Sequence, residues 1–562
     1  METNVAGKGE IKVRISKSLS DGEEVAITSR KKKVRNALSK LGMQCDLENI
    51  PNIAVLASGG GMRAMIAVYG ILTELKKYNL LDCVMYLTGV SGATWCLPNL
   101  YKNEDWSEEI ENLSKCHLEN LVQGQWDINK AIKAVLEATE DECYSLTDFW
   151  SYFLVHRLLN KFEEEKLSEH AGSCENGKNP YPIYAAVNKH TYQNPNAGTW
   201  FEFTPHEVGI PGLGTYVDSK YFGSIFQNGQ LIREKREKNI CYLQGLWGSA
   251  LAGEHEISKT ISDALTYFGK YERSEDITSK DLETDVKKLN MLYECYQTVL
   301  ELQLLESTDK EGLDKLDHLE NILKDYNSSK SYQLVREMRE TWYSADEQSK
   351  KENHMTLFQT LDADFGDFTN DFNKMCLKMV KKTCLCLLNW TWGNINNFLY
   401  HCSDVESPEL TSDPIISLID AGLTINTAYP SVLRPERQVK LILSFDCSAG
   451  DPFLTIKKAA EYCEAHAIPF PKIDENALQD LDNLSDCYIF RGEHMPTIIH
   501  CPLFNKTNCP GEIAEYREQF STFKLSYSAE DIEKLLIAAK KNVANVQQKI
   551  LEEIKHIVGS PS

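Results

Sequence analysis

The sequence predicts an α/β fold in which short buried strands lead into helices through tight glycine turns. An apolar run at 53–57 precedes the turn Ser58–Gly61, and apolar residues then recur with helical spacing over 64–78. A second unit repeats this plan, with an apolar run at 83–87 before the turn Gly89–Gly92. Short apolar runs between turn signals are typical of buried strands. At 562 residues, the chain is long enough for one large α/β domain with insertions.

The second turn carries a serine at the position that suits a nucleophile. Ser91 lies in Gly89-Val90-Ser91-Gly92, between the predicted strand and a stretch that begins a helix after Ala93. On such a strand-turn-helix elbow a serine hydroxyl is exposed above the sheet edge, and small neighbours let a substrate carbonyl approach. The short pattern alone is also typical of a structural turn. Its pairing with a second glycine turn favours a serine hydrolase.

The first turn supplies groups that a nucleophile needs beside it. Backbone N–H groups of consecutive glycines at a helix start are unobstructed by Cβ atoms and can bind an oxyanion, which the helix dipole also favours. Arg63 follows in Gly59-Gly60-Gly61-Met62-Arg63. Its guanidinium offers a fork of donors suited to a phosphate next to the acyl group.

The first turn also matches the dinucleotide-binding pattern G-x-G-x-x-A over Gly59–Ala64. That fold needs an acidic residue at the end of the second strand to hold the ribose. Here the turn around Ser91 occupies that place, and Asp82 precedes the strand. The sequence therefore favours a hydrolase over a nucleotide-binding protein.

A late aspartate is the best-marked candidate for the base that activates Ser91. An apolar run at 415–419 ends in Asp420, followed by two small residues, which places the carboxylate at a sheet edge. A carboxylate kept from bulk water takes the serine proton directly if burial raises its pKa toward the working range.

The alternative base is a histidine, as in serine-aspartate-histidine hydrolases. His466, His494 and His500 follow the late aspartate in the order that such a triad requires. None of the 13 histidines sits in a recognisable base motif. The sequence therefore favours the aspartate as the base and leaves the histidines as the alternative.

Three motifs resemble the cytosolic (group IV) phospholipase A2 family in content, order and spacing. They are Ser58–Met65, Gly89–Trp95 and Asp420–Asn426. Further stretches similar to that family lie at 144–150, 200–205, 246–250 and 444–451. The resemblance implies a three-layer α/β fold of the patatin-like phospholipase kind, with a helical insertion in the catalytic domain.

The resemblance also implies a Ser-Asp dyad that needs neither a cofactor nor a metal. The implied site residues are Ser91 as nucleophile, Asp420 as base, Gly60 and Gly61 as oxyanion donors, Arg63 as the residue that binds the substrate phosphate, and Arg437 as a supporting residue. The implied reaction is attack of the serine on an acyl ester of a glycerophospholipid, followed by hydrolysis of the acyl-serine. The alternatives are a lysophospholipase or transacylase with the same dyad, or a lipid-binding or structural protein that keeps the fold without activity.

The chain departs from the best-known family members at both ends. Its first catalytic motif begins near residue 50, so we expect no calcium-dependent C2 module before it. The chain is therefore most similar to the gamma type, which lacks that module, and we expect activity without calcium. The stretch Ile557–Ser562 contains no cysteine that could carry a prenyl group.

Composition changes along the chain predict its domain organisation. Residues 1–48 form a basic N-terminal leader, and residues 49–527 form the phospholipase catalytic domain. Within that domain, residues 255–370 form an acidic helical insertion and residues 374–390 a possible lid. Residues 528–562, with apolar positions at helical spacing, form a C-terminal helix.

Charge and hydropathy bound the partners and the compartment. A net charge of −22 argues against nucleic-acid binding. No apolar run reaches the roughly 18 residues of a membrane span, and the 17 scattered cysteines suggest free thiols in a reducing compartment. We expect a cytoplasmic protein peripherally associated with intracellular membranes such as the endoplasmic reticulum or nuclear envelope. The basic helix predicted over Arg30–Leu41 contacts lipid, serves as a nuclear targeting signal or packs on the domain.

Overall fold

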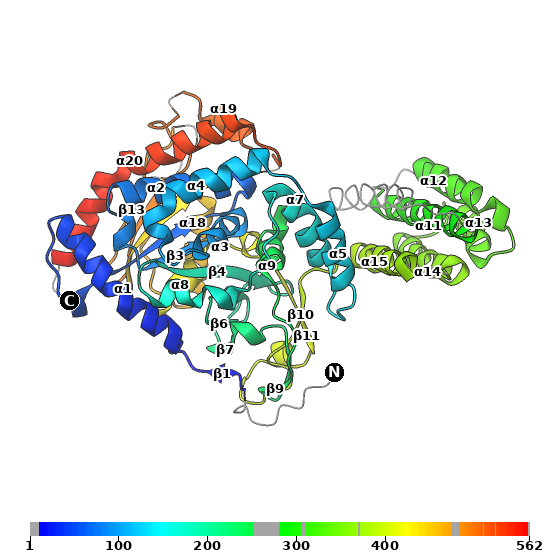
Figure 1. The fold of residues 1–562 in the computed structure, drawn as a ribbon, viewed down its shortest axis with the longest axis horizontal. Helices are drawn as coiled ribbons and strands as arrows, with labels where there is room; N and C mark the ends of the chain where they lie inside the picture. Colours follow the sequence, from blue (N-terminus) through cyan, green and yellow to red (C-terminus); the bar gives the residue numbers. More distant parts are fainter. Residues whose placement is uncertain are drawn as a thin grey trace. The chain divides into compact units, whose positions relative to one another are not determined.

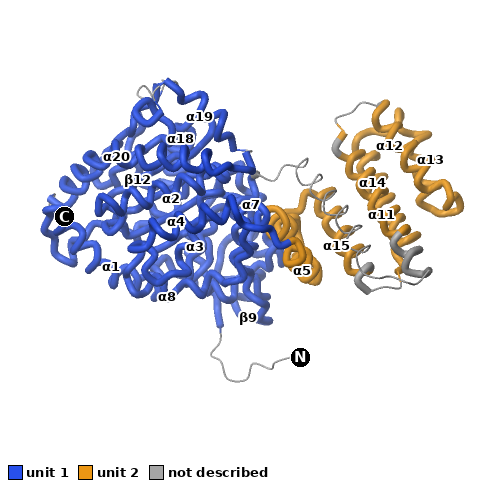
Figure 2. Tube along the Cα trace, turned by 45° about the horizontal axis from the view of Figure 1, so that its top comes forward, with its two compact units in different colours: residues 1–127, 155–251, 394–562 blue, residues 128–154, 252–393 orange. Residues whose placement is uncertain are grey.

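The computed structural model describes residues 11–251, 280–305, 309–368, 371–474, 478, 481, 483–509, 511–522 and 524–559. The chain forms two compact units, which Figure 2 colours blue and orange. Unit 1 comprises residues 1–127, 155–251 and 394–562, and unit 2 comprises residues 128–154 and 252–393. Residues 1–10 of the predicted leader, 255–279 of the predicted insertion and 560–562 of the predicted C-terminal helix lie outside the described residues.

Unit 1 is built on a large mixed sheet (Figure 1). In order across the sheet, its strands are β1 (Arg14–Ile15), β7 (Thr215–Asp218), β6 (Glu207–Ile210), β5 (Trp200–Phe203), β4 (Tyr181–Asn188), β3 (Tyr86–Gly89), β2 (Asn52–Ala57), β12 (Val439–Asp446), β14 (Thr497–Pro502) and β13 (Tyr488–Phe490). Strand β11 (Ile415–Asp420) pairs with β4 and with β10 (Asn394–Asn396), while β8 (Ile225–Gln227) and β9 (Gln230–Arg233) form a separate hairpin. This mixed sheet confirms the predicted α/β class.

The five central strands β4, β3, β2, β12 and β14 run parallel. Their residues are almost all buried, as expected for strands that helices cover on both faces. Phe445 lies opposite Ala57, Ala57 opposite Gly89, and Gly89 opposite Tyr184. The turns after β2, β3 and β12 therefore leave the sheet at the same edge, which is where ligands bind in open parallel sheets.

Strand β11 brings Asp420 to this same edge from the opposite direction. It runs antiparallel to β4 and pairs Asp420 with Ala186, two residues beyond the Tyr184 that faces the end of β3. Residues nearly 330 positions apart in the sequence are thereby placed next to one another, since Ser91 follows β3 directly.

Helices pack on the sheet of unit 1. They are α1 (Asp21–Lys40), α2 (Gly61–Lys77), α3 (Leu97–Tyr101), α4 (Trp106–Gln123), α7 (His156–Leu159), α8 (Ala171–Glu175), α9 (Ile240–Trp247), α16 (Pro408–Thr411), α17 (Tyr429–Val432), α18 (Leu454–Ala465), α19 (Ile513–Gln519) and α20 (Ala529–Gly559). Helices α2, α4 and α20 pack against one another, and α20 also contacts β12 and β14 (Figure 1). Helix α17 contacts α18 and β5.

Helix α1 contains the basic stretch that the sequence singled out, and it packs within unit 1. Val34, Ala37 and Leu38 are buried on its inner face. Arg30 is also buried there, and its guanidinium donates to the carbonyls of Val84 at 2.5 Å, Leu81 at 3.1 Å and Lys178 at 2.7 Å. The helix thus contributes a structural arginine to unit 1 besides its exposed basic side chains.

Unit 2 is helical. Its helices are α5 (Ile128–Ala138), α6 (Leu146–Phe149), α11 (Lys280–Leu304), α12 (Asp309–Ile322), α13 (Lys330–Thr341), α14 (Glu347–Phe365) and α15 (Asp371–Leu388). Tyr296 of α11 stacks on Phe358 of α14 with ring centroids 4.2 Å apart. The possible lid at 374–390 falls largely on α15, where Lys378 pairs with Glu140 at 2.6 Å inside the unit. A lid role for this helix stays a prediction.

Candidate active site

Ser91 lies on a tight turn immediately after β3. Its backbone φ is 52°, in the left-handed region that residues other than glycine seldom adopt. A Cβ atom on Gly92 would lie 2.1 Å from the Gly61 carbonyl oxygen, so only glycine fits at that position. The short helix η3 (Ser91–Trp95) begins at the serine, which is 5% exposed. Strained backbone of this kind is common at functional sites.

The glycine turn between β2 and α2 lies against the serine turn, because Gly61 is packed closely on Gly92. The Ser58 hydroxyl accepts a hydrogen bond from the Cys447 amide at 2.7 Å, which fixes the start of the turn to the end of β12. Gly60 precedes α2 and Gly61 is its first residue, so their N–H groups have no acceptor within the helix. Two backbone donors at a helix N-terminus beside a serine suit an oxyanion. The oxyanion role of these glycines stays a prediction.

Asp420 is fully buried at the end of β11. Its Oδ1 accepts from the Gly422 amide at 2.8 Å, its Oδ2 accepts from the Ala250 amide at 3.2 Å, and its own amide donates to the Ser249 hydroxyl at 3.0 Å. Burial raises the pKa of Asp420 to about 6, while a hydrogen bond from the Ser91 side chain and the two amide hydrogen bonds act in the opposite direction. The structure thus brings the predicted nucleophile and the predicted base into contact.

The three histidines of the alternative triad lie in other surroundings. His500 is buried, and its Nε2 contacts the Pro452 carbonyl at 2.8 Å. The Nδ1 of His466 contacts a carbonyl of α18 at 2.8 Å, and the side chain of His494 is 92% exposed. Among the described residues, the polar partners that the structure gives Asp420 include no histidine. This geometry favours the aspartate as the base.

Arg63 lies buried in the first turn of α2. Its Nε and Nη2 donate to the Cys447 carbonyl at 2.9 and 2.7 Å, its Nη1 donates to the Phe520 carbonyl, and its Nη2 also donates to Thr522 Oγ1 at 3.3 Å. Burial lowers the pKa of Arg63. A Cβ atom on Gly60 would lie 2.7 Å from Nη2, so the guanidinium lies against the glycine turn and supports it. Binding of a substrate phosphate by Arg63 stays a prediction.

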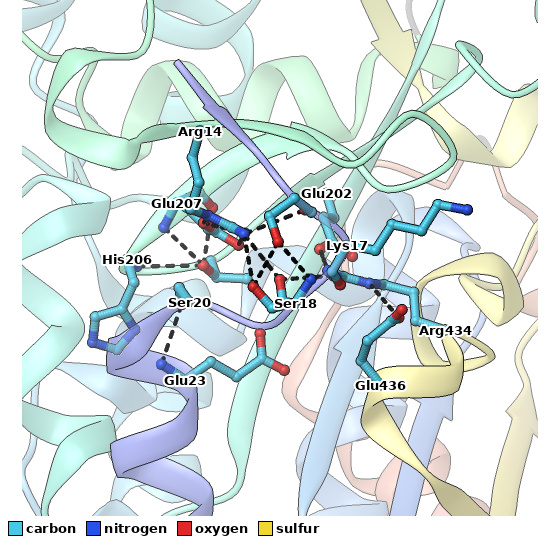
Figure 3. Close-up of polar contacts among 12 residues, drawn as sticks. Arg14, Lys17, Ser18, Ser20, Glu23, Glu202, His206, Glu207, Arg434 and Glu436 are labelled. Carbon is cyan, nitrogen blue, oxygen red and sulfur yellow. Dashed lines mark hydrogen bonds and ion pairs between the residues drawn. The ribbon is translucent and has the colours of Figure 1, made fainter. Parts of the chain in front are cut away.

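Arg437 lies in a buried network of ion pairs that joins α1 to the sheet. Its guanidinium donates to Glu23 at 2.8 and 3.0 Å and to Glu202 of β5 at 2.7 and 3.2 Å. These three side chains are fully buried. Arg434 also pairs with Glu202 and donates to the Lys17 carbonyl at 2.9 Å (Figure 3). Arg437 therefore links α1 and β5 in this structure, and its support of activity stays a prediction.

We expect the variant Arg437→Met to lose about 3 kcal/mol or more of unfolding free energy, because Glu23 and Glu202 would keep buried charges without this partner. Urea unfolding followed by circular dichroism measures the change. Arg233→Met is the matched control, since Arg233 is exposed on β9 and its replacement should cost less than about 0.5 kcal/mol. Unchanged unfolding with lost activity would instead place Arg437 in catalysis.

Two polar residues of the site were not assigned a role from the sequence. Asn426 Nδ2 donates to the Gly59 carbonyl at 3.1 Å and to Ser448 Oγ at 2.9 Å, and the Asn426 carbonyl accepts from the Gly59 amide at 3.0 Å. Ser249 holds the backbone of Asp420, as described above. The available signal was their place within the stretches that resemble the phospholipase family.

Two properties of the described residues bear on cofactors and membranes. No group of three or more histidine, cysteine, aspartate or glutamate side chains among them is arranged to hold a metal ion. Within the same part of the chain, every helix is too short or too polar to cross a bilayer. All 17 cysteines are described, and each is a free thiol.

Comparison with known proteins identifies relatives over nearly the whole chain. A family model described as lysophospholipase catalytic domain matches residues 53–287. The sequence is 36% identical over 569 residues to cytosolic phospholipase A2 gamma of Mus musculus, and the alignment covers 97% of this chain and 92% of that protein. It is also 36% identical over 558 residues to cytosolic phospholipase A2 gamma of Homo sapiens, and that alignment covers 98% of this chain and 97% of that protein.

Solved structures confirm the expected fold. Human GIVD cytosolic phospholipase A2 superposes with a TM-score of 0.66 at 23% sequence identity, covering 98% of this chain and 68% of that chain. The same human protein in complex with methyl gamma-linolenyl fluorophosphonate gives a TM-score of 0.62. From the sequence identity and coverage of the gamma relatives, the chain belongs to the cytosolic phospholipase A2 family and is a hydrolase of the phospholipase A2 and lysophospholipase class.

Proposed function

We propose that this protein cleaves an acyl ester of glycerophospholipids through Ser91 and Asp420, without calcium. The observation that carries the proposal is the fully buried Asp420 carboxylate, whose pKa is influenced by the Ser91 side chain. With its pKa raised to about 6, this carboxylate is ionised at neutral pH and is more basic than an ordinary aspartate. It therefore suits direct removal of the serine proton.

The first half of the proposed reaction forms an acyl-serine. Ser91 Oγ attacks the ester carbonyl carbon while its proton passes to Asp420. The amides of Gly60 and Gly61 stabilise the oxyanion that forms. The bond between the carbonyl carbon and the glycerol oxygen then breaks, and the leaving oxygen takes the proton from Asp420. The lysophospholipid departs and the acyl group remains on the serine.

The second half releases the fatty acid. Water attacks the acyl carbon, Asp420 accepts a proton from it, and collapse of the intermediate returns that proton to Ser91 Oγ. A lipid hydroxyl in place of water would give transacylation. A lysophospholipid that enters as the first substrate would be cleaved by the same groups. Support for a lysophospholipase activity comes from the matched domain description over residues 53–287.

We further propose a peripheral contact with intracellular membranes, since the substrates of such an enzyme reside in bilayers. The exposed basic side chains of α1 are one candidate surface; among them are Lys32, Arg35 and Lys40. Basic residues near an anionic surface contribute roughly 1 kcal/mol each. The cytoplasm is the proposed compartment, in keeping with the names of the gamma relatives.

The function is tested by incubating the purified protein with a phospholipid and with its lyso form, each labelled in the acyl chain. We expect release of labelled fatty acid from at least one of them, with equal rates in the presence and absence of a calcium chelator. Loss of activity in chelator would contradict calcium independence. Failure to release fatty acid from either lipid would contradict the proposed function.

The raised pKa of Asp420 predicts a pH dependence. Because the base must be ionised to take the serine proton, kcat/KM should rise with pH and level off above about pH 6. Below that value it should fall about tenfold per pH unit. A soluble ester measured from pH 4.5 to 8.5 gives the profile. A midpoint near pH 4, the ordinary range of aspartate, would show that burial does not shift the base as described.

A further inference from the structure

We propose that Asn426 is a positioning residue for the water that releases the acyl group from Ser91. The inference rests on the function proposed above and assigns a further residue to its second half. Asn426 is half-buried in the segment that follows Asp420. The two ends of its side-chain amide have different surroundings, and this difference carries the argument.

The nitrogen end of the amide is held away from the reacting atoms. Nδ2 donates to the Gly59 carbonyl at 3.1 Å and to Ser448 Oγ at 2.9 Å, and these two acceptors use both of its hydrogens. The backbone of Asn426 adds a third link, because its carbonyl accepts from the Gly59 amide at 3.0 Å. These bonds fix the orientation of the side chain.

The oxygen end lies among the catalytic groups. A Cβ atom on Gly59 would lie 2.4 Å from Asn426 Oδ1 and 2.7 Å from Ser91 Cβ, so the oxygen and the serine side chain flank one point. A Cβ atom on Gly422 would lie 2.8 Å from Asn426 Oδ1 and 3.1 Å from Asp420 Oδ1. The amide oxygen therefore shares the space around Gly59 with the serine side chain and the space around Gly422 with the Asp420 carboxylate.

An amide oxygen at this place is suited to a water molecule in the second half of the reaction. In the acyl-serine, Ser91 Oγ carries no proton. The attacking water has two protons, and each needs an acceptor. One proton passes to Asp420, and the other can be held by a hydrogen bond to Asn426 Oδ1. The water oxygen then directs a lone pair at the acyl carbon, forms the new C–O bond, and Ser91 Oγ leaves with the proton that Asp420 returns.

An asparagine fits this task better than a second carboxylate would. Its oxygen accepts a hydrogen bond but does not compete with Asp420 for the proton. A neutral neighbour also leaves the pKa of Asp420 to burial, whereas a second negative charge would raise it further. The first half of the reaction needs no water, so Asn426 Oδ1 should matter there much less.

The rates of the two halves of the reaction are measured separately by stopped flow, with a nitrophenyl ester of a short fatty acid as substrate. The burst of nitrophenolate reports formation of the acyl-serine, and the steady state that follows reports the slower of release and acylation. A fluorophosphonate probe is the second readout, because it reacts with Ser91 without using water. The variants are Asn426→Ala and Asn426→Ser, and the matched control is Asn36→Ala, which replaces an exposed asparagine of α1 outside the site.

In both Asn426 variants we expect steady-state turnover to fall about tenfold, as for one lost hydrogen bond to the attacking water. The burst rate and the rate of probe labelling should change less than about threefold, and intact-mass spectra should show acyl-enzyme accumulating. Hydroxylamine, a stronger nucleophile than water, should restore release. Asn36→Ala should stay within about threefold of the parent in every measurement.

Equal losses of burst, labelling and turnover in the Asn426 variants would overturn the inference, because they would show that the side chain only keeps the glycine turn in shape. Complete loss of labelling in both variants would do the same. If the probe labels the parent but the Asn426 variants turn over at the parental rate, the inference is wrong and the proposed function still stands. A parent that is not labelled at all would contradict the proposed function itself.

Discussion

Replacing the nucleophile should abolish activity without disturbing the fold. We expect Ser91→Ala to lose at least about 10⁴-fold in the hydrolysis of a labelled phospholipid, as other serine hydrolases do without their nucleophile. Alanine and serine both carry a Cβ atom, so the strain of the left-handed backbone at φ 52° is the same in both. The unfolding midpoint should therefore remain close to that of the parent.

The control for this experiment is Ser412→Ala, which replaces an exposed serine after α16 that the proposed reaction does not use. It should keep most of the activity. Residual phospholipid hydrolysis in Ser91→Ala above the level of a protein-free blank would contradict the assignment of the nucleophile. A lowered unfolding midpoint would attribute part of the loss to the fold.

Replacing the base should be nearly as damaging. We expect Asp420→Asn to lose about 10²–10⁴-fold in kcat, because the amide keeps the shape of the carboxylate but cannot accept the serine proton. Activity should not recover at higher pH, since an amide has no ionisation to complete. The measurement is hydrolysis of a soluble ester by the parent and the variant at two or three pH values.

The burial of Asp420 also predicts how stability depends on pH. The folded-state pKa of Asp420, about 6, is higher than its ordinary value of 3.8, so the folded protein holds its proton longer than the unfolded chain does. This carboxyl therefore lowers the stability of the parent as pH rises from about 4 to about 6, and Asp420→Asn should lack this decrease. The NH2 group of the variant would face one of the backbone amides that donate to the carboxylate, so the variant should also lose stability at every pH. Thermal unfolding of both proteins from pH 4 to pH 7 measures the two effects.

Histidine variants test the alternative that the base is a histidine. His466→Ala, His494→Ala and His500→Gln should each keep most of the activity of correctly folded protein, because none of these rings is a partner of Asp420 among the described residues. A histidine variant as inactive as Asp420→Asn, with an unchanged unfolding midpoint, would show that the base is a histidine.

The sequence predicted the elements that local pattern specifies. The strands β2 and β11 were recognisable as apolar runs, whereas the run predicted at 83–87 lies partly in a short helix, and its strand β3 is Tyr86–Gly89. The strand β3 ends two residues before Ser91, and β11 ends at Asp420 itself. Glycine turns after two of these strands identified the catalytic edge of the sheet, because few residue types other than glycine fit a tight turn at a strand end. The resemblance then gave the order of the motifs, and the family was confirmed.

What local pattern could not predict is how buried side chains are paired across long sequence distances. The sequence did not predict that Arg63 donates to the backbone of Cys447 and Phe520, some 400 residues away, while its binding of phosphate stays a prediction. Arg437 likewise meets Glu23 at the other end of the chain. Such partners depend on strand order, which no local pattern contains.

The helical unit shows a second limit. The acidic stretch at 255–370 was predicted as an insertion from its charge and helical spacing, and α11 to α14 lie within it. Residues 128–154 belong to the same compact unit, although more than a hundred positions separate them from it. Their sequence is ordinary amphipathic helix, and only tertiary packing assigns it to this unit.

The central claim is that Ser91 is the residue that carries the acyl group. Its most direct test is peptide mapping by mass spectrometry after the purified protein reacts with a fluorophosphonate probe. The account predicts one modified peptide, with the added mass on Ser91, and no modification in Ser91→Ala. A probe found on any other serine of the parent, or labelling that persists in Ser91→Ala, would contradict it.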